Sequence, residues 1–135
     1  VADGGYLTVV AKGQRAVKNV ETERKLVGIG MDCGFGGKNT DQVLEVLAKH
    51  NTNITFFMTG YFVRTFPEES KRVLAAGNEI GDHTNTHPQL TKERPYSMMR
   101  QIVFPAETMA ETLGVSPRLM RPPQGKTILQ FTNRV

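Results

Sequence analysis

Short apolar runs alternate with amphipathic stretches over most of the chain. The first run, Leu26–Met31, is apolar apart from its glycines and stops at Asp32, which is typical of a strand buried on both faces. A second run at residues 54–59 is rich in β-branched and aromatic residues, as strands are. Two shorter runs lie further along the chain. The predicted strands are residues 26–31, 54–59, 79–81 and 119–120.

The residues between these runs repeat apolar positions every three or four residues, which predicts helices. The first helix begins at Asn39 or Thr40, either of which can cap it, and ends near residues 50–51. Pro67 opens a second helix, and Gly77 ends it.

A third helical pattern covers residues 99–113 and ends at Gly114. Pro105 lies inside this pattern and lacks the backbone N–H that the helix interior needs, so we expect a kink or a break there.

The repeated order of strand and helix predicts an α/β fold in which helices cover a parallel sheet. A closed eight-stranded β/α barrel needs about 250 residues, whereas this chain has 135. We therefore expect an open sheet or a barrel that lacks part of its strands. The predicted domains are an N-terminal β leader at residues 1–25, where glycines separate short β-prone runs, and a β/α domain at residues 26–135 that lacks its C-terminal part.

Composition excludes some classes of function. The 17 basic and 13 acidic side chains give a net charge of +4, but the two signs are interleaved, which argues against a nucleic-acid-binding face. No apolar stretch approaches the roughly 18 residues of a membrane span, and no segment resembles a signal peptide. Cys33 is the only cysteine, which excludes an internal disulfide framework.

Polar residues that can take part in catalysis or metal binding follow three of the predicted strands. Asp32 follows the first strand, His83 and His87 follow the third, and Arg121 follows the fourth. Asp32 alone suits a loop or helix cap as well as a catalytic role, and two histidines at this spacing are common by chance. Because parallel strands end at one edge of a sheet, we expect all of them to lie close together there. Pro88 should extend the backbone at His87, so that the pair lies on a loop, and converging neutral imidazoles are typical ligands of zinc or a similar divalent metal.

Four segments in order carry a resemblance to a known family. They are residues 29–34 (IGMDCG), 48–60 (AKHNTNITFFMTG), 77–88 (GNEIGDHTNTHP) and 121–125 (RPPQG). Together they resemble the polysaccharide deacetylase family, the NodB-homology domain of carbohydrate esterases, over about residues 18–125. The resemblance implies a deacetylase-type (β/α) barrel, which is incomplete in this chain.

The resemblance also implies roles for individual residues. The first family motif normally reads Thr-Phe-Asp-Asp-Gly, so Asp32 takes the place of the general base. His83 and His87 take the places of metal ligands, Arg121 that of the arginine that orients the base, and Gln124 that of a tyrosine whose backbone N–H helps to hold the oxyanion. The later family motifs, which include the general-acid histidine, have no counterpart before Val135.

Cys33 departs from the family pattern, because it stands where a metal-binding aspartate is usual. Two interpretations are open. As a thiolate, Cys33 would complete a Cys-His-His zinc site. As a small buried side chain it would fill space, which we slightly favour because free cysteines are among the most buried residues.

The expected function follows from these roles. The resemblance implies metal-dependent hydrolysis of N-acetyl groups on amino sugars of a cell-wall-type polysaccharide, such as peptidoglycan or chitin-like oligomers, by a secreted or wall-associated protein. The metal would be zinc, with cobalt or nickel as alternatives. The alternative function is a non-catalytic domain that binds glycan or a partner with a degenerate metal site. An exposed sheet edge predicts self-association.

Overall fold

The structure is a computed structural model that describes residue 23 and residues 25–125. Almost all of the predicted leader therefore lies outside the described residues, and the boundary at residue 25 stays a prediction. Three strands form one parallel sheet in the order β1-β2-β3. Their bounds are β1 Gly30–Cys33, β2 Thr55–Met58 and β3 Glu79–Asp82.

The predicted fourth strand is present as a single parallel bridge. Met120 pairs with Asp82 beside β3. The backbone N–H of Asp82 donates to the carbonyl of Leu119 (2.8 Å), and the N–H of Arg121 donates to the carbonyl of Asp82 (2.9 Å). These two bonds bring Arg121 to the carboxyl end of the sheet.

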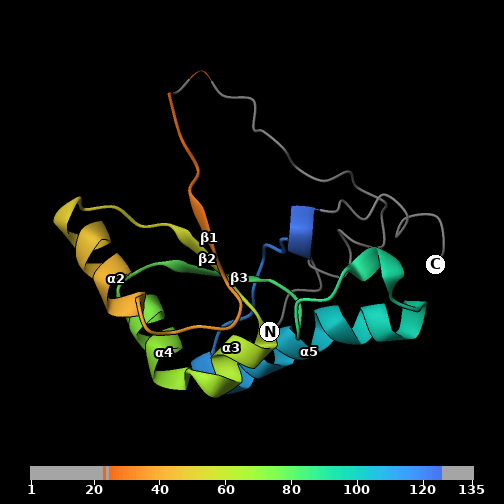
Figure 1. Cartoon of the computed structure of the whole chain (residues 1–135). Coiled ribbons are helices and arrows are strands. Elements are labelled where there is room, and N and C mark those ends of the chain that lie inside the picture. Colours follow the sequence, from red (N-terminus) through yellow and green to blue (C-terminus); the bar gives the residue numbers. More distant parts are fainter. Residues whose placement is uncertain (1–22, 24, 126–135) are drawn as a thin grey trace.

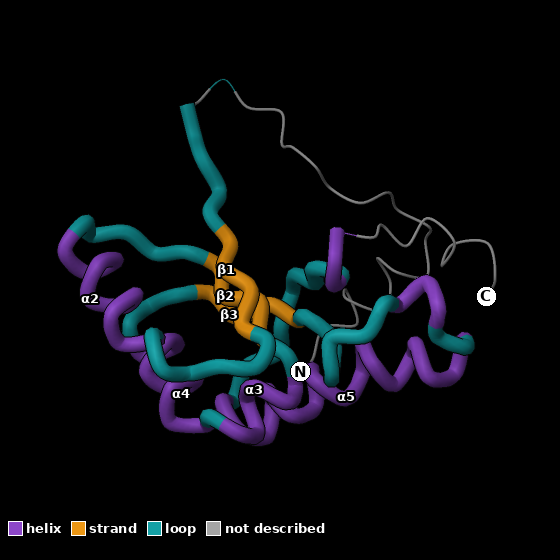
Figure 2. The backbone as a smooth tube through the Cα atoms, viewed as in Figure 1, coloured by secondary structure: helices purple, strands orange, loops and turns teal. Residues whose placement is uncertain are grey.

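The α-helices of residues 25–125 lie on one side of this sheet (Figures 1 and 2). A parallel sheet covered by helices confirms the predicted α/β class. Two short 3-10 helices, Leu90–Lys92 and Pro123–Gly125, follow β3 and the Met120 bridge. The α-helices are α2 Thr40–Lys49, α3 Gly60–Thr65, α4 Pro67–Ala75 and α5 Pro95–Leu113. None of the helices within residues 25–125 combines the length and apolar character that a membrane crossing requires.

The hydrophobic core lies between the sheet and these helices. Met31 and Cys33 of β1 pack against it, and Asp32 between them is exposed. Alternation along a strand therefore directs Asp32 to the other face of the sheet. The buried core residues are Ile54, Phe56, Met58, Phe62, Val63, Val73, Ile80 and Met109.

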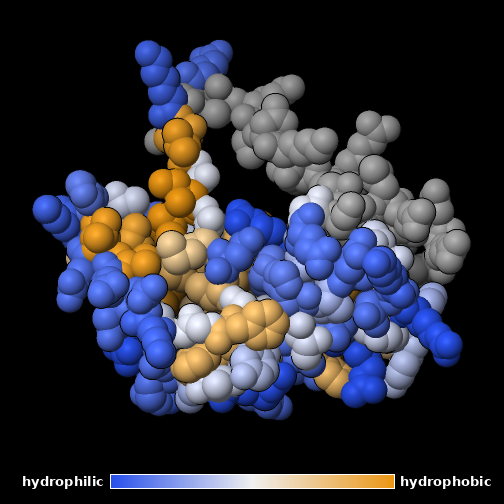
Figure 3. Space-filling view, in the orientation of Figure 1, coloured by the Kyte–Doolittle hydropathy of each residue, from blue (hydrophilic) through white to orange (hydrophobic). Residues whose placement is uncertain are grey.

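The predicted burial of residues 26–31 is wrong at its beginning. Leu26 and Ile29 are more than half exposed, and Val27 is 87% exposed. β1 starts only at Gly30, which pairs with Thr55, the first residue of β2. The preceding apolar residues extend beyond the neighbouring strand, and Figure 3 shows them as a projecting hydrophobic stretch. Self-association through such an exposed edge stays a prediction, which light scattering tests.

Helix prediction was right for α2 and α4 but failed at two places. α3 was missed, although Thr59 caps it by accepting the N–H of Phe62 at Oγ1 (2.9 Å). Of the kink or break expected at Pro105, the break is wrong, because α5 runs without interruption to Leu113, before the left-handed Gly114. The carbonyl that Pro105 leaves without a helical donor belongs to Gln101, and it accepts the N–H of Asn85 instead (2.9 Å).

Candidate active site

The carboxyl end of the sheet brings the predicted residues together. Asp32 comes from β1, His83 directly follows β3, and Arg121 follows the Met120 bridge. Arg121 Nη1 lies 2.7 Å from Asp32 Oδ1, and His83 Nε2 lies 3.7 Å from Asp32 Oδ2. The rings of His83 and His87 meet edge to face with centroids 4.9 Å apart. These four side chains form one continuous cluster.

Arg121 is held above the sheet by contacts with three groups. It donates to Asp32, and the same nitrogen lies 3.3 Å from the carbonyl oxygen of Gly30. Its guanidinium lies over the ring of Phe57 of β2, 4.1 Å from the ring centroid, in a cation–π arrangement. The guanidinium plane is therefore fixed while it faces the half-exposed carboxylate.

His83 is buried and hydrogen-bonded at one ring nitrogen. Its Nδ1 lies 2.7 Å from the carbonyl oxygen of Arg121. Because a carbonyl can only accept, Nδ1 carries the proton, and Nε2 keeps a free lone pair on the side of Asp32. Burial lowers the pKa of His83, while the bond to Arg121 and the charge of Asp32 oppose the shift. As the pH falls, His83 therefore stays neutral to a lower pH than an ordinary histidine does, and the neutral form is the one that binds metals.

His87 lies at the end of the histidine loop, which we define as residues 83–88. The loop has no regular secondary structure, as predicted. The expected extended backbone at His87 is wrong, since its φ is 59°, and Thr84 also has a positive φ of 70°. Short local bonds stabilise this shape: Thr84 donates its N–H to Asp82 Oδ1 (2.7 Å), and His87 donates its N–H to Thr84 Oγ1 (3.0 Å).

Sequence reasoning missed two aromatic rings near the site, of which Phe35 lies next to His87 and Tyr61 lies next to Phe35. Phe35 lies in the loop after β1, with its ring centroid 6.0 Å from that of His87. The ring centroid of Tyr61 of α3 lies 5.6 Å from that of Phe35. Tyr61 is 41% exposed and Phe35 is 61% exposed. In the sequence each is only an aromatic residue that follows a glycine, which is a weak signal.

Cys33 faces the hydrophobic core beside Met31. Burial raises the pKa of its thiol to about 11, and the charge of Asp32 adds to the shift. Among the described residues, no three His, Cys, Asp or Glu side chains come together in a group suited to a metal ion. Gln124 lies in the Pro123–Gly125 turn with a left-handed backbone, φ 61°.

The sequence profile for polysaccharide deacetylases matches residues 19–134. The chain belongs to the polysaccharide deacetylase family. It is 33% identical over 108 residues to the peptidoglycan-N-acetylmuramic acid deacetylase PdaC of Bacillus subtilis, covering 80% of this chain and 23% of that protein. The peptidoglycan-N-acetylglucosamine deacetylase PgdA of Listeria monocytogenes (strain 10403S) is also 33% identical, over 82% of this chain and 24% of that one.

Solved structures of the polysaccharide deacetylase family share the fold. Bacillus subtilis PdaA, a family 4 carbohydrate esterase, superposes with a TM-score of 0.78 at 31% identity, covering 95% of this chain and 56% of that one. This likeness confirms the predicted incomplete deacetylase-type (β/α) barrel. The protein BA3943 of Bacillus anthracis, described as a family pseudoenzyme, gives a TM-score of 0.74 at 26% identity, over 77% and 37% of the two chains. The chain thus spans about a quarter of these two curated relatives and about half of the PdaA structure.

We predict that Gly30→Ala disturbs this deacetylase-family site. A Cβ at Gly30 would collide with the Arg121 guanidinium and lie 2.8 Å from the Phe57 ring. The arginine should leave Asp32, and the free energy of unfolding should fall by about 1–3 kcal/mol, as for other overpacked positions. A crystal structure and chemical denaturation measure both effects.

Gly36→Ala is the matched control, because a Cβ there meets nothing within 4 Å. An Arg121–Asp32 contact that persists in Gly30→Ala with unchanged stability would contradict the importance of the space at Gly30.

We also predict that the Cys33 thiol reacts slowly. With a pKa of about 11, its thiolate fraction at pH 8 is at least about 100-fold lower than that of a free cysteine, whose pKa is about 8.5. Alkylation by iodoacetamide, followed by mass spectrometry from pH 7 to pH 11, should accelerate only toward the upper end. A reaction midpoint near pH 8.5 would show that the thiol is neither buried nor influenced by Asp32.

Proposed function

We propose that this chain hydrolyses N-acetyl groups on amino sugars of a cell-wall-type polysaccharide. The observation that carries the proposal is the contact of the Asp32 carboxylate with Arg121 and its closeness to the neutral His83. The relatives support the substrate class, because their names specify the N-acetylmuramic acid and N-acetylglucosamine units of peptidoglycan. The same names favour action outside the cell or at the wall.

His83 and His87 fit the role of metal ligands. The bond from Nδ1 to the Arg121 carbonyl leaves Nε2 of His83 as the lone-pair donor, which is the usual arrangement of a metal-binding histidine. The His87 ring lies next to it. A divalent metal held there, zinc or else cobalt or nickel, would supply Lewis-acid polarisation of the acetyl carbonyl.

The other residues would handle the water and its protons. Asp32 would accept the proton of the attacking water while Arg121 fixes the orientation of its carboxylate. The backbone N–H of Gln124 would donate to the oxyanion that develops on the carbonyl oxygen. Cleavage of the amide C–N bond gives acetate and a free amine, which must receive a proton from a donor outside this set.

We assign Cys33 the role of a core residue and not of a ligand. Its side chain packs beside Met31, on the face of the sheet opposite to Asp32. The high pKa of the thiol, about 11, also disfavours a thiolate at neutral pH. The chain would then contribute only the two imidazoles of His83 and His87 to the metal.

Phe35 and Tyr61 suit a sugar-binding surface. Both rings are exposed, with Phe35 next to His87 and Tyr61 next to Phe35. Their apolar faces can pack against the C–H groups of a pyranose. A glycan chain lying across them would bring one residue of the polymer to Asp32.

A non-catalytic, glycan-binding role is the second candidate. Cys33 in place of the usual aspartate favours it, and the family includes the BA3943 pseudoenzyme, which the chain also resembles. This candidate keeps the aromatic surface but not the hydrolytic step.

We predict acetate release from N-acetylglucosamine oligomers or peptidoglycan when zinc or cobalt is added. Asp32→Asn preserves the shape of the side chain but cannot accept the proton, so release should fall by about 100-fold or more. Enzymatic assay of acetate measures the rate. Equal rates of acetate release for the unaltered chain and Asp32→Asn would contradict the hydrolytic role. Glycan binding without acetate release would support the second candidate.

We predict that zinc binding needs both histidines of the loop. His83→Ala or His87→Ala should abolish stoichiometric zinc binding, measured by calorimetry, because a single neutral imidazole is a weak site. Cys33→Ser should change the affinity little, since the thiol lies in the core.

His50→Ala is the matched control, because His50 is an exposed residue that caps the end of α2. Stoichiometric zinc retained by the double variant of His83 and His87 would contradict the ligand assignment.

A further inference from the structure

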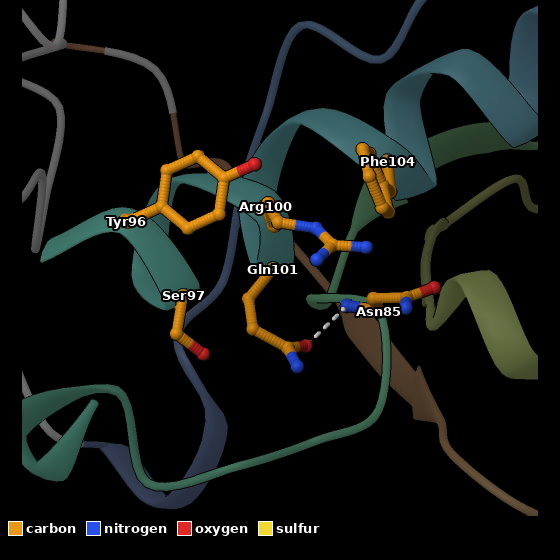
Figure 4. Close-up of a pocket in the computed structure, with 6 residues that line it drawn as sticks. All are labelled: Asn85, Tyr96, Ser97, Arg100, Gln101 and Phe104. Carbon is orange, nitrogen blue, oxygen red and sulfur yellow. Dashed lines mark hydrogen bonds between the residues drawn. The ribbon is translucent and has the colours of Figure 1, made fainter. Parts of the chain in front are cut away.

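One residue of α5 holds the middle of the histidine loop through both its backbone and its side chain. The carbonyl of Gln101 accepts the N–H of Asn85 (2.9 Å). Its side-chain Oε1 accepts the N–H groups of Asn85 (3.1 Å) and Thr86 (3.0 Å), and its Nε2 donates to Thr86 Oγ1 (2.9 Å). Figure 4 shows the Gln101 side chain directed at Asn85. Gln101 therefore satisfies two consecutive N–H groups of the loop.

The backbone contact depends on the proline that sequence analysis expected to break the helix. In an α-helix with any other residue at position 105, the N–H of that residue would donate to the carbonyl of Gln101. Pro105 has no N–H, so this carbonyl is available to Asn85. The proline in α5 thus converts an internal helix acceptor into an acceptor for the histidine loop.

The opposite side of the loop is held by α3. Gly60 donates its N–H to the carbonyl of Thr84 (3.0 Å), and Tyr61 donates its N–H to the carbonyl of Asn85 (2.9 Å). A Cβ at Gly60 would lie 2.5 Å from Asn85 Oδ1 and 3.3 Å from the Cα of Pro105. The loop is therefore packed closely between the start of α3 and the middle of α5.

These contacts hold the part of the loop between the two histidines. Asn85 and Thr86 lie between His83 and His87 in the sequence, and the residues on either side of this pair, Thr84 and His87, have positive φ. Non-glycine residues adopt this conformation at a cost and keep it only where surrounding contacts enforce it. His83 has its own bond to Arg121, so the clamp on Asn85 and Thr86 mainly determines where His87 lies.

We propose that Gln101 is a positioning residue that fixes the histidine loop so that His87 faces His83, and that Pro105 makes its carbonyl available for this purpose. The inference deepens the proposed function and rests on its metal site. Residues that orient metal ligands typically contribute about 10- to 100-fold to metal affinity. Gln101 should contribute in this range without touching the metal or the substrate.

The test compares Gln101→Met, Gln101→Glu and the control Gln42→Ala in the whole chain. Methionine keeps the length and helix propensity but removes the side-chain hydrogen bonds, whereas glutamate keeps an acceptor for Asn85 and Thr86. Gln42 is an exposed residue of α2. Zinc affinity is measured by competition with a chromophoric chelator, and amide hydrogen exchange by NMR without metal.

Gln101→Met should weaken zinc binding by about 10- to 100-fold. It should accelerate exchange strongly at Thr86 and less at Asn85, whose N–H keeps the Gln101 carbonyl as an acceptor. In Gln101→Glu, the zinc affinity and the exchange rates should lie within a few-fold of those of the original chain. Gln42→Ala should leave both quantities unchanged. Wild-type zinc affinity in a folded Gln101→Met protein would overturn the proposal, as would unchanged exchange at the two amides. If the unaltered chain binds no zinc, the metal assignment fails separately, and the exchange rates alone decide whether Gln101 holds the loop.

Pro105→Ala provides an independent arm, because it leaves the Gln101 side chain intact. The new N–H at position 105 competes with Asn85 for the Gln101 carbonyl. Exchange at the Asn85 amide should accelerate and zinc affinity should fall, even though α5 gains a hydrogen bond. Unchanged exchange at Asn85 would overturn the role assigned to Pro105.

Discussion

The arrangement of the site depends on the contacts of Arg121 with three elements of the sheet. Its N–H donates to the carbonyl of Asp82, which places it beside the end of β3. Its carbonyl accepts the proton on His83 Nδ1, and its guanidinium contacts the Asp32 carboxylate. One residue thereby determines the tautomer of a buried histidine and the orientation of a carboxylate from a strand distant in sequence. The base and the metal ligand proposed for deacetylation are thus linked through a single backbone segment.

The sheet makes room for Arg121 by omitting side chains. In the register of the sheet, Phe57 of β2 pairs with Asp32 of β1 and with Gly81 of β3. Its ring lies between Gly30 and Gly81 and would collide with a Cβ at either glycine. The guanidinium then stacks on this ring. Small residues on the outer strands and a large ring on the central strand thus form a flat support. This support explains the glycine at position 30 of β1, two residues before the catalytic candidate Asp32.

The sequence was sufficient to predict features that depend on local pattern and on strand direction. Asp32, His83 and Arg121 lie at one edge, as expected, because the carboxyl ends of parallel strands coincide. Features that depend on contacts between distant residues were not predicted. The exposure of Val27 depends on where β2 begins. The continuity of α5 at Pro105 depends on Asn85, whose N–H donates to the Gln101 carbonyl. The left-handed backbone of His87 likewise requires the hydroxyl of Thr84 and the contacts of the histidine loop, which override the local influence of Pro88.

The protonation of His83 links the fold to the proposed chemistry, because only the neutral ring with its proton on Nδ1 presents Nε2 to a metal. Nitrogen-15 NMR of the histidine side chains tests this most directly, in metal-free protein at pH 7, with His83→Gln used to assign the signals. We predict a neutral ring protonated at Nδ1, in agreement with the lowered pKa of His83 and the Arg121 carbonyl as acceptor. A ring protonated at Nε2, or a charged imidazolium at that pH, would contradict it.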